Sequence, residues 1–411
     1  MKTETVRAVN RLTGHWAAQA LARDTGTVFA ASGVWPLLAL LADGASGPAR
    51  AELAQALDIP ADAAAGAARE LLAALAGVRG LRAATGLWTA AGLPLEEDWS
   101  SRLPAGARGT LTGVPFADER ALDAWAAERT GGLIEHVPVT WPGDSCLVLA
   151  SALALRVRWA EPFRETPLAM AEGPWARRVL RRLSRSTRAL DGVRVADGPA
   201  GPVTVLEVAG TEDVDVHLLL GEPGAPSRSV LRTGLAAVTG AAASLPGSEL
   251  PDGTPGPGLT IRTEHSPYPV DLLTVHAVAF SLSADHDLLD HAPLFGLATA
   301  TDADRRGHFR GISSEPLAIG SARQSAMARF HATGFEAAAV TSVVGRFGGA
   351  ARPPANRRVR RADVRFDRPF GFLAVHRASR LVLAAGWVTD PDGAVEGGRH
   401  VGARRPAPRS R

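Results

Sequence analysis

Helical and strand-like stretches are unevenly distributed along this sequence, and their order restricts the fold more than any single motif does. Apolar side chains recur with helical spacing through the first 80 residues, and residues 61–78 are rich in alanine and leucine. Strand-like stretches follow at residues 146–159, 203–220 and 370–388. Because helices and strands do not alternate, the sequence predicts an α+β protein with mixed or antiparallel sheets, in contrast to a doubly wound parallel sheet.

The length and composition are those of a globular protein with a sizeable core. The chain has 411 residues, of which 46% are hydrophobic and 21% are charged, so one large domain or two ordinary ones are both possible. No apolar run reaches the roughly 18 residues that a membrane helix needs, and no membrane contact is expected. The single cysteine, Cys146, excludes an internal disulfide and lies in an apolar strand-like stretch, which indicates a buried thiol.

Arginine supplies nearly all of the positive charge and is concentrated in two places. Residues 346–365 contain seven arginines and one acid, and five more arginines follow Pro391. A basic tail can bind nucleic acid, which is one interpretation of this pattern. The glycine, proline and serine content of residues 392–411 favours the other interpretation, a solvated and disordered tail, so nucleic acid is not expected as a partner.

No motif in the sequence indicates catalysis. There is no Gly-x-Ser-x-Gly turn, and a phosphate-binding loop would need a lysine where the chain has only Lys2. Residues 285–291 gather three aspartates and two histidines, but histidines five residues apart share a helix face poorly, and Asp at a helix start is a common cap. The sequence therefore predicts a protein that is not an enzyme and has no metal site and no cofactor.

One segment is unusual in its side chains. Residues 334–344 are small and almost uncharged, and they become β-capable toward their end. An alanine-rich helix is the simple interpretation of this segment. Small side chains at alternate positions also suit a strand that slides between two others, where there is little room, and we prefer this second interpretation.

This segment and several distant ones resemble the serpin family. Gly334-x-Glu336-Ala-Ala-Ala-x-Thr341 is similar to the hinge of the serpin reactive loop. Five further stretches resemble family motifs in the same order along the chain: Gly44 to Gly47, Asp123 to Ile134, Leu147 to Phe163, Phe309 to Ser313, and Val364 to Val388. Each match is weak alone, but six in the right order are specific.

The resemblance implies a single-domain serpin fold over residues 1–391. It implies a large mixed or antiparallel sheet, two smaller sheets, eight to nine helices and an exposed reactive loop at about 334–363. It also implies a monomer. The sequence begins without the apolar stretch of a secretory signal, which predicts a cytoplasmic protein, whereas the family resemblance offers an extracellular location as the alternative.

The resemblance also implies a function, the inhibition of a serine protease, possibly a trypsin-like one. The protease would cleave the loop, and the freed hinge would insert as a new strand into the large sheet. The hinge residues carried over from the family motif are Gly334, Phe335, Glu336, Ala337, Ala338, Ala339 and Thr341. Counting back from Phe366 places the cut near Arg357 and Arg358, and counting forward from Gly334 places it near Arg346, so the preferred bait residue is Arg358, followed by Arg346.

Four residues depart from the family pattern and leave a second function open. Phe335 occupies a position where inhibitory members have Thr or Ser, and a large ring pointing inward is expected to overpack the sheet, which costs roughly 1–3 kcal/mol. Ala332, Gln324 and Ser151 replace residues that support or close the sheet in the family. These changes favour, as the alternative, a non-inhibitory serpin-fold protein with a binding or regulatory role.

Overall fold

The computed structural model describes residues 1–22, 25–137, 139, 146–302, 307–335 and 357–394. Within these ranges the chain forms seven α-helices and three short 3-10 helices, whereas the resemblance implies eight to nine helices. The α-helices are α1 (Thr3–Ala20), α2 (Ala31–Gly44), α3 (Gly47–Leu57), α4 (Ala61–Ala76), α5 (Glu97–Ser101), α6 (Pro115–Thr130) and α7 (Ser227–Thr239). No helix in the described part of the chain combines the length and apolarity needed to cross a bilayer.

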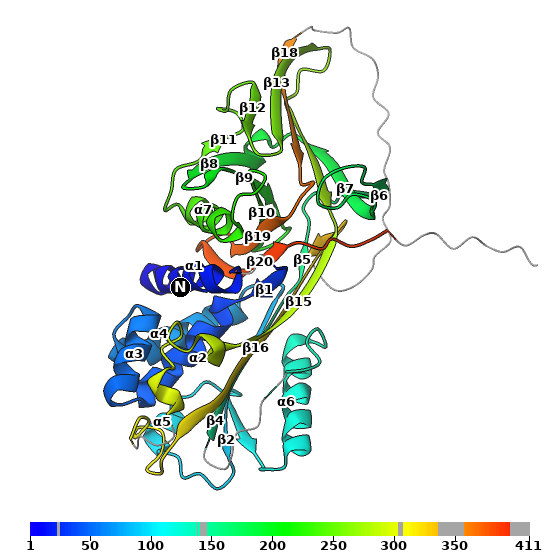
Figure 1. Cartoon of the computed structure of the whole chain (residues 1–411). Helices are drawn as coiled ribbons and strands as arrows, with labels where there is room; N and C mark the ends of the chain where they lie inside the picture. Colours follow the sequence, from blue (N-terminus) through cyan, green and yellow to red (C-terminus); the bar gives the residue numbers. More distant parts are fainter. Residues whose placement is uncertain (23–24, 138, 140–145, 303–306, 336–356, 395–411) are drawn as a thin grey trace, which may run out of the picture.

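The strands form three sheets, as predicted for a single α+β fold (Figure 1). The long sheet mixes parallel and antiparallel pairs and has the order β3 (Arg108–Leu111), β2 (Leu81–Ala90), β4 (Cys146–Leu155), β16 (Ala318–His331), β17 (Gly334–Phe335) and β5 (Val157–Arg158). An additional strand, β15 (Phe280–Asp287), pairs with β16.

The central sheet packs against the end of the long sheet that carries β5, and the upper sheet lies beyond the central sheet (Figure 1). The central sheet has the order β1 (Thr27–Phe29), β20 (Leu381–Val388), β19 (Phe370–His376), β10 (Val214–Gly221), β9 (Gly201–Val208), β8 (Val193–Gly198) and β11 (Leu245–Pro246). The upper sheet has the order β12 (Gly253–Gly256), β13 (Leu259–Ser266), β18 (Arg357–Arg365), β14 (Leu272–Val278), β7 (Val179–Thr187) and β6 (Arg164–Ala169).

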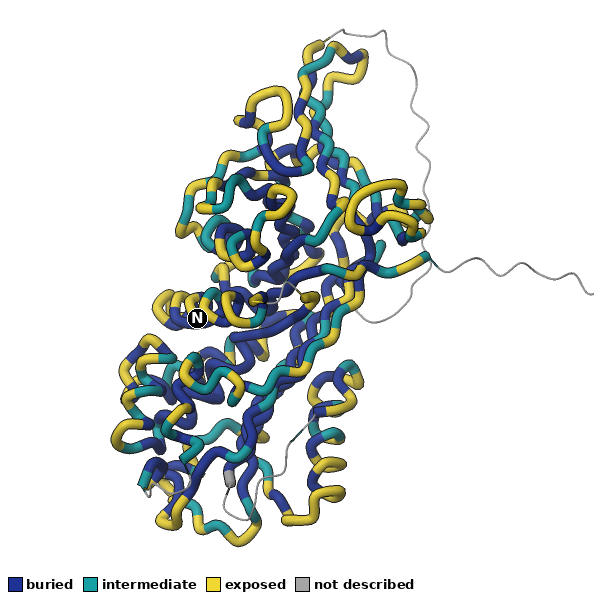
Figure 2. Tube along the Cα trace, viewed as in Figure 1, coloured by how far each residue is buried: buried dark blue, intermediate teal, exposed yellow. Residues whose placement is uncertain are grey.

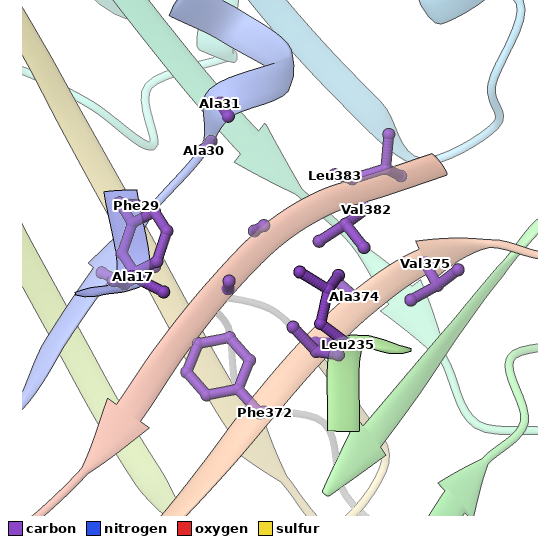
Figure 3. Packing of buried hydrophobic residues seen from close by; sticks show 14 of the residues in the cluster. Ala17, Phe29, Ala30, Ala31, Leu235, Phe372, Ala374, Val375, Val382 and Leu383 are labelled. Carbon is purple, nitrogen blue, oxygen red and sulfur yellow. The ribbon is translucent and has the colours of Figure 1, made fainter. Parts of the chain in front are cut away.

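One continuous core joins the long sheet to the central sheet and helices α1–α4. Figure 2 shows the buried positions concentrated in α2 and in the strands around it. Figure 3 shows buried side chains on neighbouring strands of the central sheet, among them Phe29 of β1, Val382 of β20 and Phe372 of β19, with Ala30 and Ala31 leading from β1 into α2. A second, smaller apolar cluster lies under α6, where Leu122 and Ala126 pack against the other face of the long sheet. The long sheet is therefore covered on both faces, which gives its strands their apolar character.

Two of the motifs that were singled out in the sequence meet in space. Gly311 donates its backbone N–H to the carbonyl of Gly44 (3.1 Å), and Ser46 donates to the carbonyl of His308. A Cβ on Gly44 would lie 2.2 Å from a side-chain carbon of Ile312, so this contact requires a glycine. The pair ties the end of α2 to the segment before β16 across more than 260 residues of chain.

The structure differs from the sequence prediction at residues 253–266. Residues 245–258 are rich in glycine and proline, which predicts a surface loop, but Gly253–Gly256 forms the short strand β12 and Leu259–Ser266 forms β13. β13 pairs with β18 over eight residues, so the hairpin covers what would otherwise be the edge of the upper sheet. Leu259 and Ile261 are buried, and their alternation with Thr260 and Arg262 is a strand signal that the glycine- and proline-rich stretch obscured.

The ordered chain also extends past the predicted end of the domain at residue 391. Asp392 donates its N–H to the carbonyl of Ala279, and Ala394 donates to the carbonyl of Val179. The segment after β20 therefore remains bonded to β7 and β14–β15. The basic residues 395–411 lie outside the described residues.

Candidate functional site: the split end of the long sheet

β4 and β16 are direct neighbours along most of their length and separate at one end. They pair in parallel from Cys146 with Ala318 to Leu153 with Ala326. Beyond Leu153 the two strands separate, and the two residues of β17 pair with β16 on one side and with β5, the short strand that follows β4, on the other. The first two residues of the predicted hinge thus already form a strand in this split.

Gly334 fits between two backbones that leave no room for a side chain. Its strand partners are His331 on β16 and Arg158 on β5. A Cβ at Gly334 would lie 2.3 Å from the carbonyl oxygen of Val157, a distance at which the backbone would have to move. The glycine of the predicted hinge is therefore required by a close approach of main chains.

Phe335 points into the core, as the predicted alternation requires, but the expected overpacking is wrong. The ring is 1% exposed and lies 5.8 Å from the ring of Phe372, between centroids. Phe372 in turn packs against Phe280, which stacks on Phe330 at 5.4 Å. The core between the long and central sheets already holds this aromatic cluster, so Phe335 fills space that the fold provides and anchors the hinge.

Backbone hydrogen bonds hold the turn between β16 and β17. Trp159 donates its backbone N–H to the carbonyl of Thr333 (3.1 Å), and its indole N–H donates to the carbonyl of His331 (2.8 Å). Phe163 donates its N–H to the carbonyl of Ala332 (2.7 Å). Ala332, which replaces a residue that supports the sheet in the family, is therefore held through its main-chain carbonyl.

A buried amide closes the sheet below the split. Gln324 of β16 is fully buried; its side chain donates to the carbonyl of Ala30 and accepts from the N–H of Ala30, both at 2.8 Å. The Nε2 atom also lies 3.5 Å from the hydroxyl of Ser151, its ladder partner on β4. The sequence identifies Gln324 and Ser151 as departures from the family pattern. It does not reveal the two hydrogen bonds between Gln324 and Ala30, because these depend on the start of α2 lying beside the sheet.

The candidate bait residues fall in different places. Arg357 and Arg358 are the first residues of β18, where they pair with Ser266 and His265 of β13. The predicted loop of residues 334–363 therefore overlaps a strand, because β13 and β14 bind β18 on both sides. Arg346 lies outside the described residues, as do the remaining predicted hinge residues, Glu336, Ala337, Ala338, Ala339 and Thr341.

The acidic and histidine-rich stretch at 285–291 is used in structural contacts. Asp285 accepts from the hydroxyl of Ser325 (2.6 Å), and Asp287 caps the 3-10 helix Leu288–His291 by accepting from the N–H of Leu289. His286 contacts the carbonyl of Val28, and burial lowers its pKa. Among the residues that the structure describes, no three His, Cys, Asp or Glu side chains are grouped to hold a metal ion.

Comparisons with known proteins agree with this geometry. A family model described as "Serpin (serine protease inhibitor)" matches residues 9–172 and 260–391. A putative serpin-Z6C from Oryza sativa subsp. japonica is 37% identical over 95 residues, which are 23% of this chain and 21% of that protein, so the match spans about a fifth of the relative's length.

Solved structures with the same fold cover nearly the whole chain. Thyroxine-binding globulin in complex with thyroxine superposes with a TM-score of 0.70 at 15% identity, covering 95% of this chain and 100% of that one. Native protease nexin-1 with heparin gives 0.69 at 16% identity, covering 95% and 100%. Serpin48 of the insect Tenebrio molitor gives 0.67 at 18% identity, covering 95% and 98%.

Proposed function

This chain belongs to the serpin family, and from this premise we propose that it traps a serine protease by inserting its cleaved loop into the long sheet. The observation that carries the proposal is the seating of β17. Gly334 and Phe335 already pair with β16 on one side and β5 on the other, so insertion needs only to continue a strand that has begun. We propose no catalytic role for the chain.

The two ladders of β17 agree on where the following residues would land. Extending the pairing with β16 places residue 339 opposite Ala326, and extending the pairing with β5 places it opposite Leu153. Ala326 and Leu153 are already ladder partners of each other. A strand that continues from β17 would therefore enter between β4 and β16 without any shift of register on either side.

The same register seats two polar residues next to chemically suitable partners. Thr341 would lie between Ser151 and Gln324, replacing the direct contact across the closed sheet with hydroxyl and amide partners on both sides. Glu336 would lie between Arg156 and Arg329, both of which are exposed. Between these two positions, Ala337 and Ala339 would face the core, where there is little room for a larger side chain.

Insertion would release enough free energy to deform a bound protease. β4 and β16 share eight partner pairs, and an inserted strand would replace one ladder with two. The net gain is about eight backbone hydrogen bonds at about 1 kcal/mol each, before any apolar burial is counted. This is comparable to the whole stability of a typical domain, so a protease attached to the loop end could be distorted before it hydrolyses the acyl bond.

The bait would lie within residues 336–356, and Arg346 now replaces Arg358 as its preferred residue. An arginine suits a trypsin-like pocket with a carboxylate at its base. Trypsin is therefore the probe: incubation with the full chain should give a covalent complex that survives SDS, with a new N-terminus inside residues 336–356. Complete cleavage of the loop with no complex at any ratio would reject the inhibitory function.

A non-inhibitory binding or regulatory role is the second candidate, and the anchoring of Phe335 favours it. A hinge that is held by an aromatic cluster could be a fixed part of the fold, with no insertion after cleavage. Thyroxine-binding globulin, one of the structural neighbours, was solved with thyroxine bound. This candidate predicts cleavage by trypsin without any covalent complex and without a rise in melting temperature.

A further inference from the structure

A large cavity opens where the upper and central sheets meet, and neither residue of β17 lines it. Its volume is about 930 Å³, at the upper end of the range for small-molecule sites. Four segments form most of its walls: the end of β6 with the residues that follow it (168–174), the turn between β10 and α7 (221–225), the linker between β18 and β19 (365–369), and the end of β20.

Local sequence explains why this space is not filled. The turn at 221–225 reads Gly-Glu-Pro-Gly-Ala, with Gly224 at a φ of +81°, and the 168–174 wall includes Ala169, Ala171 and Gly173. Such residues turn the chain but offer little volume. The inner surface is apolar and comes from larger side chains, namely Val230, Val278, Phe366 and Trp387, which are buried, and Met170, which is half-buried. Thioether and indole groups suit a flat or flexible apolar body.

Cationic groups lie on the upper-sheet side of the cavity. Arg182 donates through Nε to the hydroxyl of Thr166, and no carboxylate among the described residues pairs with it. His276 lies 3.4 Å from Asp363 and near Arg182 and Arg365; burial lowers its pKa, Asp363 opposes this shift, and the two arginines add to it. Arg365 itself is paired with Asp363.

Arg368 adds a buried donor from the linker wall. Its terminal nitrogens bond Asp367 and the carbonyl of Gly221, but its Nε is buried with no acceptor among the described residues. The acidic side chains that line the cavity are Asp367, which Arg368 pairs, and Glu172 and Glu222, which are exposed to solvent. Solvent can therefore screen the charges of Glu172 and Glu222 at the cavity mouth. No carboxylate in the described part of the chain pairs with the guanidinium of Arg182.

The cavity depends on parts of this chain that the family model does not match. The match is interrupted from residue 173 to residue 259, and this interval supplies Arg182, Val230 and the whole 221–225 wall. Loop insertion as proposed above uses none of these residues. The cavity is therefore a separate feature of this chain, and its occupancy does not depend on whether the loop inserts.

We propose that this cavity binds a small amphipathic anion, with a flat aromatic or short alkyl body on the Phe366–Trp387 surface and a carboxylate, sulfonate or phosphate group on Arg182. The apolar surface supplies most of the affinity through burial. The guanidinium selects the anion through charge-assisted hydrogen bonds, which are about twice as strong as neutral ones.

The test uses two fluorescent probes with the same apolar body on the full chain. 1-Anilinonaphthalene-8-sulfonate carries an anionic group, and N-phenyl-1-naphthylamine lacks it. We expect saturable binding of the sulfonate at one site per chain. Ala225→Trp, which fills the cavity from the turn wall, should abolish binding of both probes. Arg182→Gln should weaken the sulfonate about tenfold and leave the neutral probe unchanged.

The matched control is Arg188→Gln, which removes an exposed arginine just after β7 that does not line the cavity. Thermal melting checks that each variant is folded; if Ala225→Trp is not, Ala171→Trp replaces it, because Ala171 is exposed on the opposite wall. Sulfonate binding that survives a folded cavity-filling variant overturns the site. Equal loss of both probes, or of neither, in Arg182→Gln overturns the assignment of the anion to that arginine.

Discussion

Replacing one small inward residue of the hinge with arginine should stop the insertion part of the way. Phe335 points into the core, so residues 337, 339 and 341 would follow it inward at the period of two that a strand imposes. Ala339 would land between Leu153 and Ala326, which are 2% and 4% exposed. Ala338 would point to the opposite face, between the half-buried Met327 and the buried Ala154, where a long side chain can extend toward the exposed Arg156 and Arg329 on that face.

The magnitude follows from what the inward arginine would have to bury. An unpaired guanidinium in a packed interior costs several kcal/mol, and its excess volume costs roughly 1–3 kcal/mol more. The inserting strand would avoid this cost by stopping before residue 339 enters the sheet. All eight β4–β16 pairs lie at or beyond residue 339 in this register, so the whole gain of about eight hydrogen bonds, about 8 kcal/mol of the driving force, would be lost.

The assay compares Ala339→Arg with its neighbour Ala338→Arg, which adds the same charge and volume to the loop. Both variants should melt like the unchanged protein before cleavage. With trypsin, Ala339→Arg should be cleaved with almost no SDS-stable complex, whereas Ala338→Arg should retain most of the complex. Complex formation by Ala339→Arg at the unchanged stoichiometry would refute the inward register and, with it, the continuation of β17.

Three further changes test other parts of the account. Gly334→Ala places a Cβ 2.3 Å from the Val157 carbonyl oxygen and should prevent β17 from pairing with β5. Phe335 would then leave the core, which should lower the free energy of unfolding in urea by about 2 kcal/mol. An unchanged free energy of unfolding would contradict the pairing of β17 between β16 and β5. Thr341→Val should lower the melting temperature of the loop-cleaved form by a few degrees and leave the uncleaved form unchanged, whereas an equal effect on both forms contradicts the predicted row. Burial lowers the pKa of His217 to about 4. The free energy of unfolding should therefore be unaffected by this group above pH 6.5 and should fall by about 3 kcal/mol as the pH falls from 6.5 toward 4. His217→Leu should remove this part of the pH dependence of urea unfolding, and an unaltered pH profile would contradict the burial of a neutral His217.

The fold could be predicted because its signals are local and repeated. The helix near residue 123, the Gly44 and Gly311 segments and the final strands each carry a short pattern, and their order along the chain indicates the topology. The position of Gly334 could be predicted from the pattern that follows it, although the contact that requires a glycine there comes from Val157 of a distant strand. Small side chains and a glycine are visible in a sequence whatever lies around them.

The parts that were missed depend on neighbours from distant segments. Arg357 and Arg358 resemble a solvated loop in the sequence, because nothing near them shows that β13 and β14 bind this stretch on both sides. The overpacking expected at Phe335 assumed a full core, but Phe372, which lies beside it, belongs to a different sheet. From the sequence, Gln324 is interpreted as the loss of a residue that closes the sheet. The structure shows that its amide instead bonds the backbone of Ala30 at the start of α2, a contact that the sequence does not reveal.

The melting temperature of the protein before and after cleavage within residues 336–356 tests the central claim most directly. A net gain of about 8 kcal/mol, set against an unfolding entropy of about 0.8 kcal/mol/K for a chain of this size, corresponds to a rise of about 10 °C. We expect a rise of that size once mass spectrometry confirms the cut. A cleaved protein that melts at or below the temperature of the intact one would show that the long sheet accepts no further strand.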